Sequence, residues 1–163
     1  MNHDELESIY QQYYTPLFLF ALSLTQNKED AEDLVANTFV KAFLSFEKGN
    51  LKAWLYTVLR NEFYTMYKRK SKIMDERNFD FSQLPSKLDV LEEIIHNQQK
   101  QWLYKQIYQM KPQERNVLLL SIQKDLKDSE IAEILNLNTA HVRVIKNRAK
   151  TKLIELSKKE DIL

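Results

Sequence analysis

Glycine is almost absent from this chain, and this scarcity constrains the fold more than any other feature of the sequence. Among 163 residues there is one glycine, Gly49, and there are three prolines, Pro16, Pro85 and Pro112. Turn-rich folds, above all the all-β folds, depend on these two residue types, because glycine adopts positive φ and proline fixes φ in turns. We therefore expect a fold built from helices.

Composition excludes several classes of protein. Hydrophobic residues make up 44% and charged residues 29% of the chain, which is ordinary for a globular protein and unlike a disordered one. The chain has no cysteine, which excludes disulfide scaffolds and cysteine-based zinc sites. The N-terminal sequence MNHDELESIY contains no signal-peptide run, and the apolar stretch 17–24 is too short to span a bilayer. We expect a cytoplasmic protein with no membrane insertion.

Apolar residues at helical spacing divide the chain into two parts. The periodicity is lost between residues 71 and 89, where polar residues and Pro85 stand, and it resumes afterwards. Basic residues gather near the end of each part, which suggests two contacts with one polyanion. The sequence predicts an all-α protein of two small helical domains and a flexible linker: domain 1–72, linker 73–97 and domain 98–163.

Local signals predict where the helices of the first part begin and end. Pro16 falls inside the first apolar run, so we expect a kink or a break between two helices at this point. Asn27 is a typical N-cap residue and begins a helix to about Phe46, which Gly49 and its neighbours terminate. A further helix is expected over 51–70.

The segment DSEIAEILNLNTAHVRVIKNRAK, which starts at Asp128, has the pattern of a helix-turn-helix. Asp128 can cap a short first helix. Asn136 stands in the turn, where asparagine is the best residue after glycine for a left-handed backbone. Asn138 or Thr139 then caps the second helix. The buried side of the two helices is predicted to consist of Ile131, Ala132, Leu135, Val142, Ile145, Ala149 and Leu153.

The second helix of this motif presents a basic outer face. Such a helix fits the major groove of DNA with its N-terminal residues near the base edges. Arg143 can form hydrogen bonds to the edge of a guanine and Asn147 to the edge of an adenine, whereas the lysines would mainly contact phosphates. A solvated basic helix is the alternative, but the apolar pattern of both helices favours DNA binding. The residues predicted to face DNA are Thr139, Ala140, His141, Arg143, Val144, Lys146, Asn147 and Lys150.

The segment LKAWLYTVLRNEFYTMYKRKSK interleaves aromatic residues with a basic end. Bases stack on aromatic rings and phosphates need positive charge, so this combination is typical of surfaces that bind single-stranded nucleic acid. We interpret four of its residues as ordinary core: Trp54, Leu55, Val58 and Leu59. The first surface candidates are Arg60, Asn61, Tyr64 and Tyr67.

Taken together, these motifs resemble the compact RNA polymerase sigma factors of the extracytoplasmic-function group, over nearly the whole chain. Segments 30–43 and 54–70 resemble the family's regions 2.1–2.2 and 2.3–2.4, and segment 112–120 with the helix-turn-helix resembles region 4. The chain departs from the family pattern at Ala36-Asn37, where Gln-Glu is usual, and at Ile145-Lys146, where an arginine usually precedes an apolar residue. The aspartate that is frequent in the 2.3–2.4 helix is also absent.

The resemblance implies a transcription initiation factor without catalytic residues, metal or cofactor. Core RNA polymerase would be the main partner, through its flap and the clamp helices of its largest subunit. Promoter DNA would be read at the −35 element as duplex and at the −10 element as melted bases. An anti-sigma protein is a further implied partner. The segment 71–97 would thread through the polymerase, either as a mimic of nucleic acid or as an ordinary solvated linker.

By position, the resemblance assigns two sets of residues. The set implied to bind polymerase is Asp30, Glu32, Asp33, Val35, Asn37, Thr38 and Lys41. The set implied to bind the −10 element is Arg60, Asn61, Tyr64, Tyr67, Lys68, Arg69 and Lys70.

Three other classes of protein are alternatives at this point. A two-domain DNA-binding regulator that acts without polymerase explains the helix-turn-helix but neither of the other segments. A helical enzyme lacks support, because His3, His96 and His141 are far apart in the sequence and the chain, with one glycine, has no glycine-rich phosphate loop. A helical adaptor does not account for patches that are both basic and aromatic.

Overall fold

Helices are the only regular elements in the part of the chain that the computed structural model describes, which is residues 1–71, 91–124 and 126–160. The all-α prediction is therefore confirmed. The chain divides into two units, Met1–Lys87 and Leu88–Leu163. The exact bounds of the domains and linker stay a prediction, since much of 73–97 lies outside the described residues.

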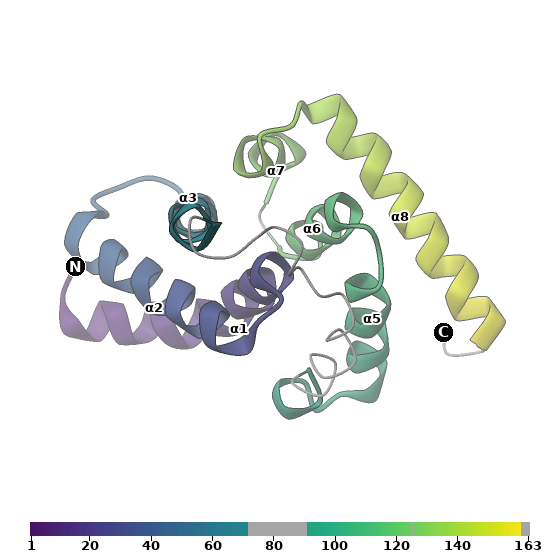
Figure 1. Cartoon of the computed structure of the whole chain (residues 1–163), viewed down its shortest axis with the longest axis horizontal. Coiled ribbons are helices and arrows are strands. Elements are labelled where there is room, and N and C mark those ends of the chain that lie inside the picture. The colour runs from purple at the N-terminus through teal and green to yellow at the C-terminus, as the bar shows by residue number, and fades with distance from the viewer. Residues whose placement is uncertain (72–90, 125, 161–163) are drawn as a thin grey trace. The chain divides into compact units, whose positions relative to one another are not determined.

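Three helices build the first unit (Figure 1): α1 (His3–Thr25), α2 (Lys28–Ser45) and α3 (Leu51–Ser71). α1 and α2 lie side by side, and α3 packs against both. Each helix contributes apolar side chains that are almost fully buried, and this burial is the main stabilising term of the unit. The largest of these core side chains are Leu17, Phe18, Phe20, Leu22, Leu34, Leu55, Tyr56 and Leu59.

α1 is one helix that runs through Pro16, so of the two predicted outcomes, a kink or a break between two helices, the break is wrong. Proline removes one N–H donor and displaces the carbonyl four residues earlier, which is that of Gln12. Gln12 is exposed, so water can hydrate the displaced carbonyl. Every residue from Leu17 to Ser23 is buried, and this packing stabilises the helical conformation of the half of α1 that follows Pro16.

Asparagine side chains cap the later helices of the first unit. Asn27 Oδ1 accepts a hydrogen bond from the Asp30 backbone N–H at 2.9 Å, which confirms the predicted start of α2. Asn50 Oδ1 accepts one from the Ala53 N–H at 3.2 Å at the start of α3. Between these helices Gly49 has a φ of +112°, so the turn uses the one glycine of the chain where other residues would be strained.

The second unit contains α5 (Gln98–Tyr108), α6 (Pro112–Ser121), α7 (Asp128–Leu135) and α8 (Thr139–Glu160), and residues 91–94 are also helical. α6 packs against α5, α7 and α8, and α7 packs against α8. Pro112 is the first residue of α6, a position that suits proline because an N–H there would have no helical partner. The fully buried large side chains described in this unit are Leu91, Ile107, Leu118 and Leu120.

Arg115 of α6 is a charged side chain in the core of the second unit, only 6% exposed. Burial lowers the pKa of its guanidinium, and the nearby Tyr108 partly opposes that change. Burial also raises the pKa of Tyr108 well above its ordinary value. Both groups are enclosed by the packing of the unit, so we assign them to the fold and not to a binding surface.

Candidate nucleic-acid interface

A tight turn at Asn136 joins α7 to α8, and the two helices form the predicted helix-turn-helix. Asn136 has φ 56° and ψ 46°, the left-handed conformation that the sequence predicted. The Leu137 N–H donates to the Ala132 carbonyl at 2.8 Å, which closes the end of α7. Asn138 Oδ1 accepts from the His141 N–H at 2.7 Å and is therefore the cap of α8.

The start of α7 differs from the prediction, because Lys127 is the N-cap residue and Asp128 is the first helical residue. The backbone N–H of Lys127 donates to the Glu130 carboxylate at 3.0 Å. Ile134 is buried at 1% exposure, whereas Leu135 is only half-buried, so the inner face of α7 is turned slightly from the predicted one. The Asp128 carboxylate is consequently available for a contact other than a cap.

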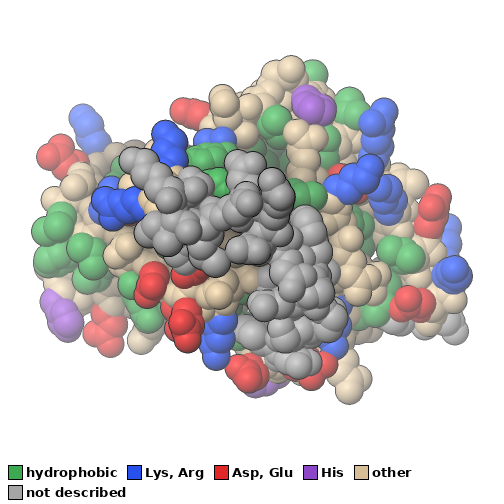
Figure 2. All heavy atoms as spheres, in the orientation of Figure 1, with side chains coloured by type: hydrophobic (Ala, Val, Ile, Leu, Met, Phe, Trp, Pro, Cys, Tyr) green, Lys and Arg blue, Asp and Glu red, His purple; other side chains and the backbone are tan. Residues whose placement is uncertain are grey.

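α8 separates its residues into two faces as predicted. Val142, Ile145 and Ala149 are buried, and Leu153 is half-buried. Lysine and arginine side chains lie along this helix on the right-hand side of Figure 2. Among the residues predicted to face DNA, Thr139 and Lys146 are half-buried. The exposed ones are Ala140, His141, Arg143, Val144, Asn147 and Lys150.

An ion-pair network connects α7 with the exposed side of α8. Lys146 Nζ donates to Asp128 Oδ1 at 2.7 Å, and Arg143 Nε lies 3.5 Å from Asp128 Oδ2. The hydrogen bond from Lys146 and the charges of both cations lower the pKa of the Asp128 carboxyl below its ordinary value. The carboxylate is therefore ionised at neutral pH and its pairing with both cations persists.

In the first unit, α3 presents a basic and aromatic surface. Arg60 Nη2 donates to the Tyr64 hydroxyl at 2.9 Å, and the Arg60 guanidinium carbon lies 4.6 Å from the centre of the Tyr64 ring. Phe63 lies within 6 Å, between ring centres, of both Tyr64 and Tyr67. Arg60 and Tyr67 are half-buried, whereas the exposed candidates are Asn61, Tyr64, Lys68 and Arg69. The side chain of Lys70 lies outside the described residues.

Tyr56 belongs to the core and not to the surface of α3. Its side chain is 1% exposed, and its ring meets the Phe20 ring edge-on at 5.5 Å between centres. Tyr56 was one of the aromatic residues that suggested a stacking platform, so this part of the signal came from packing between α1 and α3. The other side of α3, with Tyr64, keeps its aromatic surface.

On α2, two of the residues assigned to polymerase binding are buried. Val35 and Thr38 are both 0% exposed, and the Thr38 hydroxyl donates to the Leu34 carbonyl at 2.7 Å. A side chain enclosed in the core cannot contact a partner, so both are removed from that surface. Asp30 is half-buried, and the remaining four residues of the set are exposed: Glu32, Asp33, Asn37 and Lys41. Lys41 forms an ion pair with Glu62 of α3.

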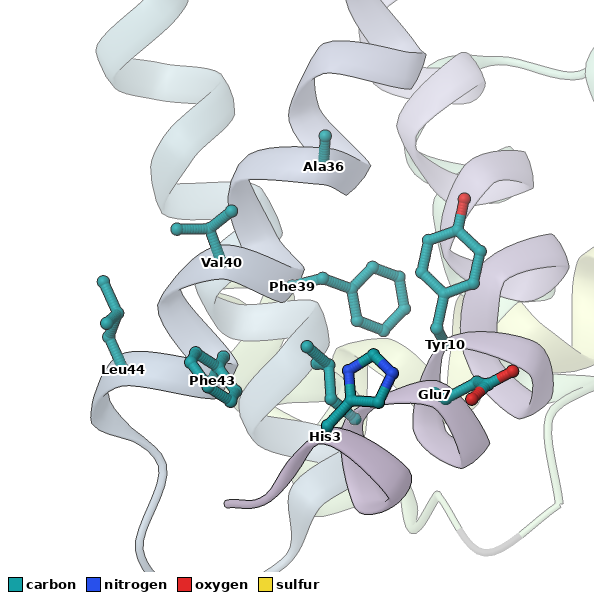
Figure 3. Close-up of a pocket in the computed structure, with 9 residues that line it drawn as sticks. His3, Glu7, Tyr10, Ala36, Phe39, Val40, Phe43 and Leu44 are labelled. Carbon is teal, nitrogen blue, oxygen red and sulfur yellow. The ribbon is translucent and has the colours of Figure 1, made fainter.

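An apolar groove of about 470 Å³ lies between α1 and α2, and the sequence reasoning did not find it. Figure 3 shows Tyr10 on one side and Phe39, Val40, Phe43 and Leu44 along the other. Hydrophobic side chains also gather on the left of the first unit in Figure 2. Phe43 is 42% exposed and Leu44 is 73% exposed. Large exposed apolar side chains that cluster in this way are typical of an interaction surface.

Other kinds of site find no support in the described residues. These residues contain no group of three or more histidine, aspartate or glutamate side chains arranged to hold a metal ion. None of the described helices has the length and apolar character needed to cross a membrane.

Comparison with known proteins decides the family. The family model for Sigma-70 region 2 matches residues 9–73, and the model for Sigma-70 region 4 matches residues 100–153. The RNA polymerase sigma factor YlaC of Bacillus subtilis is 30% identical, over 94% of this chain and 92% of its own length. The chain belongs to the sigma-70 family, in its extracytoplasmic-function group. This sigma factor is also 28% identical to the ECF RNA polymerase sigma factor SigM of Bacillus subtilis, over 91% of the chain and 92% of SigM.

Solved structures agree with this assignment. The co-crystal structure of the sigma factor RpoE with the anti-sigma factor NepR from Bartonella quintana matches with a TM-score of 0.59 and 27% identity, over 93% of this sigma factor and 98% of that chain. CnrH, solved in complex with the cytosolic domain of CnrY, shares the fold at 20% identity and a TM-score of 0.60, over 97% and 90% of the two chains. The family model of region 2 covers α2 and α3, and that of region 4 covers the helix-turn-helix.

Proposed function

We propose that this sigma factor binds core RNA polymerase and directs promoter-specific initiation by reading the −35 element as duplex and capturing melted bases of the −10 element. The chain makes and breaks no covalent bond in this role and works in the cytoplasm, where the polymerase is. The observation that supports the proposal most is that one chain carries two separate exposed cationic surfaces, on α3 and on α8, each backed by a buried core.

At the −35 element, α8 enters the major groove. Arg143 is exposed near the N-terminal end of the helix, where a recognition helix contacts base edges. Asn147 follows it by four residues, so both side chains lie on one face. Arg143 would read guanine and Asn147 adenine, while Lys150 contacts a phosphate and supplies affinity without sequence preference.

At the −10 element, α3 captures unstacked bases of one strand. Unstacking costs a few kcal/mol per base step, and stacking on an aromatic side chain offsets about 1–3 kcal/mol of this per base. Tyr64 is 44% exposed and supplies the ring, while the exposed Asn61 offers an amide for hydrogen bonds to a base edge. Lys68 and Arg69 follow one turn later and would hold the adjacent phosphates.

The polymerase-binding surface runs along α2. This surface is a stripe of exposed residues at intervals of four, three and four positions, which places them on one face of the helix. The residues of the stripe are Asp33, Asn37, Val40 and Leu44. The two apolar residues of the stripe are 57% and 73% exposed, and burying them against the clamp helices would supply much of the affinity. Glu32 and Lys41 stand at the edges of the stripe.

An anti-sigma protein is part of the same proposal. The RpoE structure that this sigma factor matches was solved in complex with an anti-sigma factor. The apolar groove between α1 and α2 shares Val40 and Leu44 with the polymerase stripe. A protein that covers this groove would therefore compete directly with polymerase.

In vitro transcription tests the proposal. Core polymerase is combined with the full chain on a library of genomic fragments, and transcript start sites are mapped with and without the chain. Initiation from a defined set of promoters only when the chain is present is the expected result. Arg143→Ala should weaken recognition of the −35 element while binding to core polymerase is retained, and equal loss of both would count against the assignment. A regulator that acts without polymerase would bind DNA but would not co-purify with core.

A further inference from the structure

Asp128 connects the start of α7 with the exposed side of α8. Its Oδ1 atom accepts a hydrogen bond from Lys146 Nζ at 2.7 Å, and its Oδ2 atom lies 3.5 Å from Arg143 Nε. The two cations are three residues apart on α8, so they are neighbours on one side of the helix. One carboxylate therefore contacts two of the residues that the sequence predicted to face DNA.

The two cations differ in how much of each side chain the pairing leaves accessible. The Lys146 side chain is only 22% exposed, and its ammonium group is engaged at short range. The Arg143 side chain is 65% exposed and meets Asp128 through Nε. The two terminal amino groups of Arg143 can therefore still pair with O6 and N7 of a guanine.

The ion pair is not a by-product of helix capping. Lys127 is the N-cap residue of α7, and the carboxylate that accepts from its backbone N–H belongs to Glu130. The Asp128 side chain is thus directed to α8 instead of to its own helix end. Its position 18 residues before Lys146 makes the contact a tertiary one that orients α8 relative to α7.

We propose that Asp128 is a positioning residue with two effects: it holds Arg143 ready for base reading, which raises the selectivity for the −35 element, and it keeps Lys146 from the DNA phosphates, which lowers the overall affinity for DNA. The inference rests on the proposed function, because it requires α8 to face that element. A side chain that is already held loses less rotamer freedom on binding. A lysine withheld from phosphates lowers the affinity for DNA of any sequence.

The test uses holoenzyme assembled from core polymerase and the full chain. The probes are a promoter duplex that wild-type holoenzyme selects from a random library and the same duplex with its −35 element shuffled. Asp128→Asn is expected to lower the ratio of the two affinities about 5-fold. It should also make the slope of log K against log salt concentration steeper by about 1, because Lys146 gains one phosphate contact.

Glu92→Gln is the matched control. It removes the carboxylate of another ion pair of the second unit, with Lys105 at 2.6 Å, and changes the net charge by the same amount without involving α8. The ratio of affinities and the salt slope are both expected to stay at the wild-type values. The same shift in Glu92→Gln as in Asp128→Asn would show a general charge effect and overturn the inference.

A double-mutant cycle separates positioning from support of the fold. In the Arg143→Ala background, Asp128→Asn should lower the ratio no further, because Asp128 acts on base reading through Arg143. An equal fall in both backgrounds, or an unchanged ratio in the single variant, contradicts the inference while leaving the proposed function intact. If shuffling the −35 element has no effect on wild-type affinity, the proposed function itself fails and the inference fails with it.

Discussion

Arg60 and Tyr64 contact each other in two ways one turn apart on α3: the guanidinium lies over the tyrosine ring, 4.6 Å from its centre, and also donates to its hydroxyl at 2.9 Å. The pair holds a half-exposed aromatic ring in place before any DNA arrives. Because the ring is already ordered, a base that stacks on it pays less of the entropy of immobilising the side chain.

Tyr64→Ala is predicted to reduce open-complex formation about 10-fold, since stacking of one base is lost. Tyr64→Phe keeps the ring and loses only the hydrogen bond to Arg60, so its effect should be less than about 3-fold. Permanganate footprinting of the melted bases measures both. Equal defects in the two variants would show that the hydroxyl, and not the ring, is what matters at this position.

Asn61→Ala is predicted to impair open-complex formation more than binding to duplex promoter DNA. The side chain is exposed on α3, so its removal leaves the fold unchanged and takes away a hydrogen-bonding group for an unstacked base. Footprints of the closed and open complexes give the two quantities separately. A permanganate pattern identical to that of the wild type would rule out a role for this residue in capture.

Leu44→Asp is predicted to lower affinity for core polymerase by about 10-fold or more, because the substitution places a charge on the apolar part of the proposed polymerase-binding stripe. The residue is 73% exposed, so thermal stability should hardly change. Fluorescence titration with core polymerase measures the affinity. Ser45→Asp adds the same charge at the next exposed position, away from the stripe, and should have a much smaller effect.

Asn136→Ala is predicted to destabilise the second unit by about 1 kcal/mol, because alanine is strained at a φ of 56°. Asn136→Gly should lie within about 0.5 kcal/mol of the wild type, since glycine relieves the strain but gains freedom in the unfolded chain. Urea unfolding followed by circular dichroism measures both changes. A glycine variant as unstable as the alanine variant would mean that the asparagine side chain itself stabilises the turn.

The Asp128 ion pair predicts a specific pH dependence of stability. The pairing lowers the pKa of this carboxyl in the folded protein below its ordinary value of 3.8. A depressed folded pKa means that the stabilisation is fully present above the ordinary value and is lost as the pH falls through the folded one. The difference in free energy of unfolding between wild type and Asp128→Asn should therefore be constant from pH 7 to about 5 and shrink near pH 3. A difference that does not change with pH would exclude the ion pair as its source.

Much of the fold was predictable because local chemistry decided it. Three predictions that used residue type and helical spacing alone are confirmed by the structure. They are the cap at Asn27, the left-handed backbone at Asn136 and the buried stripe Val142–Ile145–Ala149. Such features depend on neighbours within a few positions, which the sequence displays directly.

The features that sequence reasoning missed depend on packing between distant segments. Tyr56 belongs to the core because Phe20 packs against it from another helix. Tyrosine has an apolar ring and a polar hydroxyl, so the sequence pattern alone does not decide whether it lies on the buried or the exposed side of α3. The contact between Asp128 and Lys146 joins two helices, so predicting it requires their relative position. The continuity of α1 through Pro16 likewise depends on how the residues after Pro16 pack against the rest of the unit. Leucine is usually a core residue, and the sequence alone does not show that Leu44 is exposed, as it would be on the proposed polymerase-binding surface.

The burial of Val35 and Thr38 between exposed positions of α2 has an evolutionary consequence. Mutations at these two positions are limited by the interior of the first unit, whereas Asp33, Asn37, Val40 and Leu44 can vary without unfolding it. With the stripe as the proposed polymerase-binding surface, natural selection could adjust how strongly such factors compete for one pool of polymerase by changing the stripe alone, independently of which genes each factor switches on.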